Sequence, residues 1–76
     1  MGAGELKNTI RVQRAIKDWT QEELARRVGV TRKTINTIEN DVYVPSTVLA
    51  LKIARAFGVR VEDVFQLVEP SGRTRR

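Results

Sequence analysis

Four polar side chains lie close together in one short stretch: Arg32, Lys33, Asn36 and Thr37. In a helix, at about 100° per residue, Lys33, Asn36 and Thr37 would point outward together with Asn40, and Arg32 would lie on the flank near the helix start. Arginine and lysine can donate to guanine O6 and N7, asparagine can pair bidentately with adenine, and threonine can offer its methyl group to thymine. No acidic residue interrupts this face before Glu39. The stretch therefore predicts a surface that reads base edges, with an ordinary solvated helix face as the alternative.

The segment Thr20–Asn40 has the pattern of two short helices joined by a tight turn. Thr20 can cap the first helix, and Glu23 can complete a capping box. Gly29 follows the last apolar residue of that helix, where left-handed backbone ends a helix at the least cost. Thr31 can cap the second helix, which fills the rest of the segment.

The apolar residues of this segment recur at helical spacing and would close the angle between the two helices: Leu24, Ala25, Val28, Val30, Ile35 and Ile38. Two helices that meet at a steep angle need a small residue at the crossing, and Ala25 lies there. This combination is typical of a helix-turn-helix. A helical hairpin with a similar pattern is the alternative.

The segments TQEELARRVGV and TRKTINTIEN resemble the helix-turn-helix of the phage-repressor family, also called the Cro/repressor or Xre family. The run Tyr43–Ser46 and the later FGVRVEDVF are similar to that family too, so the resemblance covers about Asn8 to Val68. It implies an all-α, five-helix, lambda-repressor-like domain with the helix-turn-helix at helices 2 and 3. It also implies binding of double-stranded DNA, usually as a homodimer on a near-palindromic operator.

The resemblance also implies which side chains contact DNA. The base-contacting positions of the family match Arg32, Lys33 and Thr37. The positions that contact the DNA backbone match Thr20, Gln21, Thr34 and Asn40. The glutamine would clamp a phosphate at the start of a helix, where free N–H groups and the helix dipole attract an anion. Tyr43 would either add a hydroxyl contact from the loop or pack on the core.

Two further sets of residues have structural roles in this interpretation. In the family an arginine and a glutamate that match Arg14 and Glu39 form a pair, which ties the first helix to the end of the third; a solvated Arg14 is the alternative. Ala25 and Gly29 shape the turn. Five apolar residues near the end of the chain exceed what one side of a helix can bury, and they predict either a dimer interface or a wholly buried helix: Val61, Val64, Phe65, Leu67 and Val68.

The remaining elements follow from apolar periodicity. A first helix is expected from about Leu6 to Lys17, with Ala15 and Ile16 on its apolar side. A fourth helix would start after Ser46 and reach Phe57, and a short fifth would lie within residues 59–67. We expect residues 1–5 to be disordered, residues 6–68 to form the domain and residues 69–76 to form a flexible basic tail. No strand-like alternation is visible.

Composition restricts the function classes. A chain of 76 residues without cysteine or histidine has no disulfides and lacks the usual zinc or copper ligands, so neither a metal nor a cofactor is expected. The net charge is +5, but three arginines follow residue 70, and the 11 basic and 9 acidic residues before them leave +2. Charge placement therefore matters more than net charge.

The sequence thus predicts a transcriptional regulator, in the first instance a repressor. No run approaches membrane-spanning length, and a cytoplasmic protein is expected. No nucleophile–base pair is recognisable, so an enzyme is not expected. The competing hypothesis is an antitoxin-like or coactivator module that binds a protein partner.

Overall fold

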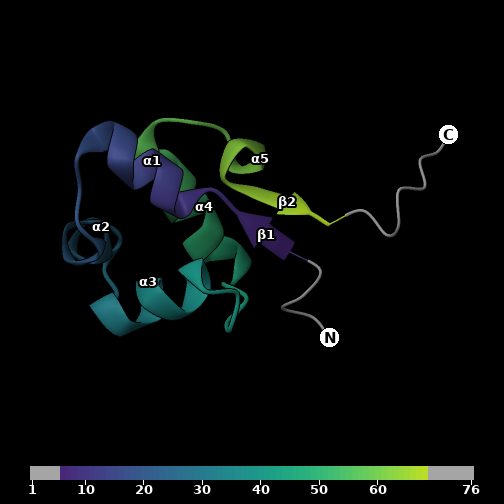
Figure 1. Cartoon of the computed structure of the whole chain (residues 1–76), viewed down its shortest axis with the longest axis horizontal. Helices are drawn as coiled ribbons and strands as arrows, with labels where there is room; N and C mark the ends of the chain where they lie inside the picture. The colour runs from purple at the N-terminus through teal and green to yellow at the C-terminus, as the bar shows by residue number, and fades with distance from the viewer. Residues whose placement is uncertain (1–5, 69–76) are drawn as a thin grey trace, which may run out of the picture.

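A computed structural model describes residues 6–68, which form five helices and one pair of short strands (Figure 1). In chain order the elements are β1 (Leu6–Asn8), α1 (Ile10–Lys17), α2 (Gln21–Val28), α3 (Arg32–Glu39), α4 (Thr47–Phe57), α5 (Val61–Val64) and β2 (Phe65–Leu67). The expected five-helix fold, with the helix-turn-helix at α2 and α3, is confirmed. The expected disordered N-terminus and basic tail lie outside the described residues.

Hydroxyl side chains start three of the helices where the sequence predicts them. Thr20 accepts from the backbone N–H of Glu23 at 3.0 Å, Thr31 from that of Thr34 at 3.2 Å, and Ser46 from that of Leu49 at 3.1 Å. Each bond satisfies a donor that the first turn of a helix leaves without a partner.

The turn between α2 and α3 depends on the backbone of Gly29. Its φ of 80° lies in the left-handed region, which a residue with a Cβ rarely adopts, and its N–H donates to the carbonyl of Ala25 at 2.9 Å. A Cβ at this position would meet no atom within 4 Å, so the requirement for glycine is conformational. Ala25 is buried at the crossing of the helices, with 3% of its surface exposed.

Only half of the expected capping box forms. The carboxylate of Glu23 turns away from Thr20 and pairs with the guanidinium groups of Arg26 and Arg27, the second at 2.7 Å. The guanidinium of Arg27 also lies 4.1 Å from the ring centroid of Trp19, within the range of a cation–π contact. Trp19 in turn stacks on Phe57, with ring centroids 5.5 Å apart.

The core is built around α4, which packs against α1, α2 and α5. Its buried residues Leu49, Ile53 and Phe57 recur every four positions, as their spacing predicts. The other buried apolar side chains come from the remaining helices: Ile10, Leu24, Ala25, Val28, Ile35, Ile38 and Val64, with Ala54 from α4 itself.

The expectation that the first helix begins at Leu6 is wrong. Residues Leu6–Asn8 form β1, which pairs antiparallel with β2, Leu6 opposite Leu67 and Asn8 opposite Phe65 (Figure 1). The N–H of Thr9 donates to the carbonyl of Val64 at 2.8 Å. The far end of the chain therefore supplies backbone partners that hold these residues extended, a contact that local periodicity does not contain.

The apolar side of α1 also differs from the expectation. Ile10 is fully buried, but Ile16 is 70% exposed and Ala15 is exposed as well. Because the helix starts at Ile10, its contact with the core involves mainly its first turn.

The fifth helix is a single turn, Val61–Val64, followed at once by β2. Arg60 replaces a hydroxyl cap, yet the helix still has a defined start because the N–H of Arg60 donates to the Asp63 carboxylate at 3.1 Å. Pairing with β1 takes the next three residues into a strand. The expected absence of strands is therefore corrected to one two-stranded sheet beside an otherwise helical fold.

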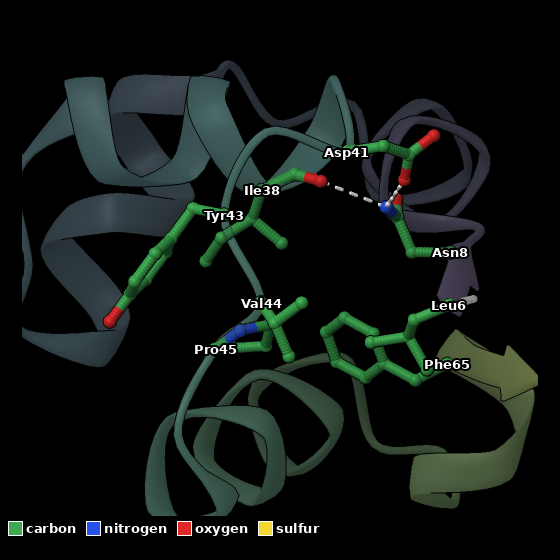
Figure 2. A pocket seen from close by; sticks show the side chains of 8 residues that line it. All are labelled: Leu6, Asn8, Ile38, Asp41, Tyr43, Val44, Pro45 and Phe65. Carbon is green, nitrogen blue, oxygen red and sulfur yellow. Dashed lines mark hydrogen bonds between the residues drawn. The ribbon is translucent and has the colours of Figure 1, made fainter. Parts of the chain in front are cut away.

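A small cavity of about 10 Å³ lies between the loop after α3 and the two strands (Figure 2). Asp41 takes a left-handed φ of 61° there. The Asn8 side chain bridges the two segments, because its Nδ2 donates to the carbonyl of Ile38 at 3.0 Å and to the Asp41 carboxylate at 3.3 Å. Its Oδ1 accepts from the N–H of Ile10 at 3.1 Å.

We predict that Asn8→Ala lowers the free energy of unfolding by about 1 kcal/mol, because it removes side-chain bonds to partly buried backbone groups of α1 and α3. Urea unfolding followed by circular dichroism would measure this change. Lys7→Ala, at the neighbouring exposed position of β1, is the control and should change stability by less than about 0.5 kcal/mol. Equal effects of the two substitutions would contradict the bridging role of Asn8.

Candidate nucleic-acid interface

The exposed side of α3 carries the residues whose types predicted base recognition. Arg32, Lys33 and Asn36 are exposed, and Ile35 and Ile38 on the other side are buried. Thr37 is half-buried, and its hydroxyl donates to the carbonyl of Thr34 at 2.9 Å. Because that proton is engaged, the groups that remain at Thr37 are its methyl and its oxygen lone pairs.

An open hollow lies between α3 and the loop that follows it. Its lining combines hydroxyl, amine and apolar side chains: Thr31, Lys33, Thr34, Thr37, Val42 and Tyr43. Tyr43 is 48% exposed, and Figure 2 shows its hydroxyl directed away from the small cavity beneath the loop. The tyrosine is therefore placed on the surface beside α3 rather than in the core.

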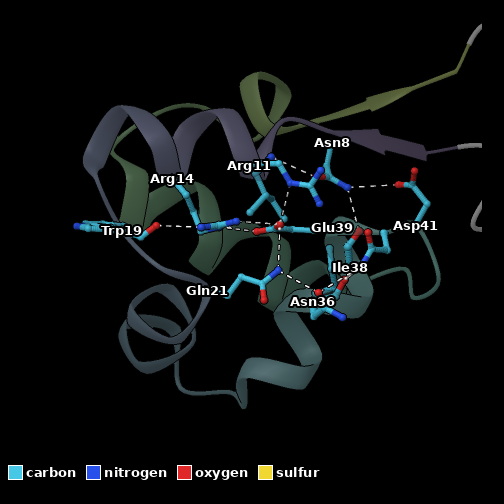
Figure 3. A network of polar contacts seen from close by, with 11 residues as sticks. Asn8, Arg11, Arg14, Trp19, Gln21, Asn36, Ile38, Glu39 and Asp41 are labelled. Carbon is cyan, nitrogen blue, oxygen red and sulfur yellow. Dashed lines mark hydrogen bonds and ion pairs between the residues drawn. The ribbon is translucent and has the colours of Figure 1, made fainter.

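Glu39 is the single acidic residue of α3, and its side chain is only 1% exposed. The guanidinium of Arg14 holds its carboxylate with two bonds, Nε to Oε2 at 2.6 Å and Nη2 to Oε1 at 3.1 Å (Figure 3). Nη1 of the same arginine donates to the carbonyl of Trp19 at 3.0 Å. The structure thus brings Arg14 and Glu39 together, and it ties α1 to both ends of the helix-turn-helix.

One further hydrogen-bond donor and one further cation complete the surroundings of this carboxylate. Gln21 Nε2 donates to Oε1 of Glu39 at 3.2 Å, and Arg11 Nε lies 3.6 Å from the same oxygen. Burial alone would raise the pKa of Glu39. The hydrogen bonds from Arg14 and Gln21 and the charges of Arg14 and Arg11 outweigh it, so the pKa lies below its ordinary value. Glu39 is therefore ionised and screened from the surface of α3.

A chain of amides extends from this carboxylate to the exposed face of α3 (Figure 3). Gln21 Nε2 also donates to Oδ1 of Asn36 at 3.1 Å. Asn40 Nδ2 donates to the backbone carbonyl of Asn36 at 2.9 Å and to its Oδ1 at 3.2 Å. The sequence reading missed this connection, since a contact between residues 21 and 36 has no signature in local spacing.

These bonds change the roles open to two of the expected phosphate-contacting residues. The side-chain NH₂ groups of Gln21 and Asn40 each have two hydrogens, and both pairs are engaged within the protein. Thr20 and Thr34 keep hydroxyl groups near the starts of α2 and α3. The base-reading candidates therefore lie together on α3. Among the phosphate-contacting candidates, Gln21 and Asn40 have their side-chain donors engaged within the protein, whereas Thr20 and Thr34 keep a hydroxyl group near a helix start.

The five apolar residues expected at a dimer interface do not share one surface. Val64 is fully buried in the core, and Val61 and Phe65 are half-buried against it. Leu67 and Val68 are 73% and 45% exposed. Of the five expected residues, only Leu67 and Val68 therefore present exposed apolar surface.

Within residues 6–68, no cluster of acidic side chains is arranged to hold a metal ion. Over the same part of the chain, no helix is both long and apolar enough to cross a membrane.

The fold and the polar surface of α3 define the class: a small helix-turn-helix domain. The sequence pattern of the family described as "Helix-turn-helix" matches residues 10–64. The chain belongs to this family and is of the Cro/Xre type.

Similar proteins agree with this assignment. The chain is 50% identical over 60 residues to an HTH-type transcriptional regulator of Methanocaldococcus jannaschii, covering 79% of this chain and 91% of the relative. It is 50% identical over 64 residues to the HTH-type transcriptional regulator YgzD of Bacillus subtilis, covering 84% and 97%.

Solved structures show the same fold. The hypothetical transcription factor NHTF from Neisseria superposes with a TM-score of 0.67 at 33% identity, over 71% of this chain and 62% of that chain. The clp gene regulator ClgR from Corynebacterium glutamicum gives a TM-score of 0.67 at 30% identity, over 71% and 57%. The chain thus spans less than two thirds of each of these two proteins.

We predict that Glu39→Gln lowers the free energy of unfolding at neutral pH by about 2 kcal/mol, because it leaves the largely buried Arg14 without its counter-charge. For a domain of this size, the melting temperature should fall by about 10 °C. Thermal melts followed by circular dichroism would measure it. Glu22→Gln, at an exposed position of α2, is the control and should cost only about 0.3 kcal/mol.

We also predict that the stability difference between wild type and Glu39→Gln depends on pH. Because the pKa of Glu39 is lower in the folded than in the unfolded chain, the unfolded state binds more protons between the two values. The contribution of the carboxylate to stability is complete above the unfolded pKa and is lost as the pH falls through the folded one. The difference between wild type and Glu39→Gln should therefore shrink in acid, and a constant difference from about pH 7 to pH 3 would contradict this assignment.

Proposed function

We propose that this protein is a transcriptional repressor that binds a near-palindromic operator as a homodimer and places α3 in the major groove. The observation that carries the proposal is the polarity of α3. Its exposed face begins with Arg32 and Lys33, and its single acid is buried and paired. A helix of this kind fits the major groove and offers donors to base edges. Relatives named as transcriptional regulators support the same class.

The proposed base contacts come from Arg32, Lys33, Asn36 and Thr37. For the DNA backbone we propose the hydroxyls of Thr20, Thr34 and Tyr43 as contacts. At Gln21 the phosphate contact is made by the backbone N–H, since the first N–H groups of a helix have no partner inside it. These contacts set register and affinity, while the base contacts set specificity.

A second copy supplies the specificity that one small module lacks, since one recognition helix reads only a few base pairs. A twofold dimer would place two α3 helices about 34 Å apart, one turn of DNA. The exposed Leu67 and Val68 at the end of β2 are the apolar groups that we propose for its interface. A regulator of this kind acts in the cytoplasm, with the DNA.

A second candidate function is an antitoxin-like or coactivator module that holds a protein partner. The observation that favours it is a pair of apolar side chains on α1, Val12 and Ile16, which are 57% and 70% exposed and lie one turn apart. Loss of a co-purified partner on Ile16→Glu, with DNA affinity retained, would support this function.

Selection from a randomised duplex library should yield a near-palindrome with half-sites one helical turn apart. Arg32→Ala should then weaken binding by about 5- to 100-fold and relax one base position in each half-site. Arg60→Ala removes the same charge from the start of α5, on the side of the molecule away from α3 (Figure 1), and should retain the motif. If no motif is selected and the binding falls steeply as salt is added, the protein binds DNA non-specifically and the proposed function is contradicted.

Substitution at the proposed dimer interface should separate assembly from folding. Leu67→Glu places a charge on a side chain that is already exposed in the monomer, so the melting transition of the domain should persist. Sedimentation equilibrium should show a dimer for the wild type and a monomer for this variant, with operator affinity reduced at least about tenfold. Leu51→Glu makes the same substitution at a 53% exposed position of α4 and is the control for charge. A wild type that sediments as a monomer both alone and on its operator would contradict the homodimer.

A further inference from the structure

We infer that Asn36 reads a base that offers hydrogen-bond acceptors, guanine before adenine, because Gln21 and Asn40 fix the direction of its amide. This inference rests on the proposed function, since it concerns a base contact of α3. It replaces two expectations from the sequence: a bidentate pair between Asn36 and adenine, and a phosphate clamp made by the side chain of Gln21.

The direction of the Gln21 amide is set by its partner. A carboxylate can only accept hydrogen bonds, so the group that faces Oε1 of Glu39 at 3.2 Å must be the NH₂ of Gln21. Glu39 is itself held by two bonds from Arg14 and is almost fully buried. Reversal of the Gln21 amide would therefore place its oxygen against a buried carboxylate, which is unfavourable.

The direction of the Asn40 amide is set in the same way. A backbone carbonyl can only accept, and the group 2.9 Å from the carbonyl of Asn36 is therefore the NH₂ of Asn40. Two independent acceptors, one on each side, thus orient the two amides that meet at Asn36.

Both of these amides present a donor to the side chain of Asn36. The bond from Gln21 is 3.1 Å and the bond from Asn40 is 3.2 Å, and they end on the same Oδ1. A carbonyl oxygen has two lone pairs, so these bonds use its full capacity. The NH₂ group of Asn36 would meet two donors if the amide were reversed. Its NH₂ is therefore the part of the amide left for a base, and the residue is exposed.

The consequence for recognition is chemical. A bidentate pair with adenine needs an asparagine oxygen that accepts from N6 as well as an NH₂ that donates to N7. Here the oxygen is occupied, and only donors remain. Guanine presents two acceptors in the major groove, O6 and N7, whereas adenine presents only N7 beside a donor. Gln21 and Asn40 are thus positioning residues for a specificity-determining Asn36.

The test is quantitative binding of wild type and variants to the selected operator and to operators with single base changes. In the wild type, one position per half-site should depend on Asn36, prefer guanine and bind about tenfold more weakly with adenine. Asn36→Ala should flatten the preference at that position alone. Gln21→Met removes one of the two donors that oppose reversal of the Asn36 amide, at similar side-chain volume. It should reduce the preference for guanine over adenine by at least about threefold.

Controls keep the outcome interpretable. Gln13→Met makes the same substitution on α1 and should leave the preference unchanged. Asn40→Ala removes the other donor to Oδ1 of Asn36. Like Gln21→Met, it should reduce the preference for guanine over adenine. This second variant decides the question if Gln21→Met melts too low to assay.

Two outcomes would overturn the inference while leaving the proposed function intact. One is a position that depends on Asn36 and prefers adenine. The other is a uniform loss of affinity for all operators in Gln21→Met and Asn40→Ala with the preference unchanged, which is the behaviour of phosphate contacts. Failure of the wild type to select any motif would instead overturn the proposed function, and the inference with it.

Discussion

The buried carboxylate of Glu39 is the constraint on which the arrangement of the first three helices depends. An ionised group with 1% of its surface exposed is stable only when its desolvation is offset, and Arg14 and Gln21 provide the compensating bonds. These partners come from α1 and from the first residue of α2. The angles between three short helices, none of which would be stable alone, are thereby tied to one polar contact.

Burial of this carboxylate also shapes the outer surface. The net charge of +2 over residues 1–70 supports binding to nucleic acid only weakly. The acid on α3 is paired beneath the surface, while Arg32 and Lys33 are exposed, so the local field of the helix is more positive than the composition suggests. The same residues that fix the helix angles therefore also remove a negative charge from the face proposed to meet DNA.

The parts of the structure that depend on residues close together in the sequence could be predicted from it. The caps at Thr20, Thr31 and Ser46 and the left-handed Gly29 follow from local chemistry, and the exposed side of α3 follows from helical periodicity. The strands were not accessible, because their pairing joins the two ends of the described chain and Leu6 also fits a helical pattern. The amide chain from Gln21 to Asn36 was missed for a similar reason: hydrogen bonds between separate helices depend on side-chain directions that spacing alone does not give.

The pairing of Leu6 with Leu67 has a consequence for the way this chain is made. It closes the longest loop in the described structure, and the entropic cost of such a closure favours forming the shorter-range helix contacts first. During synthesis the helices can dock as they leave the ribosome, but β1 has no partner until the last strand has emerged. The sheet therefore forms only after β2 has left the ribosome, and until then the segment before α1 is an unpaired strand exposed to the surroundings of the nascent chain.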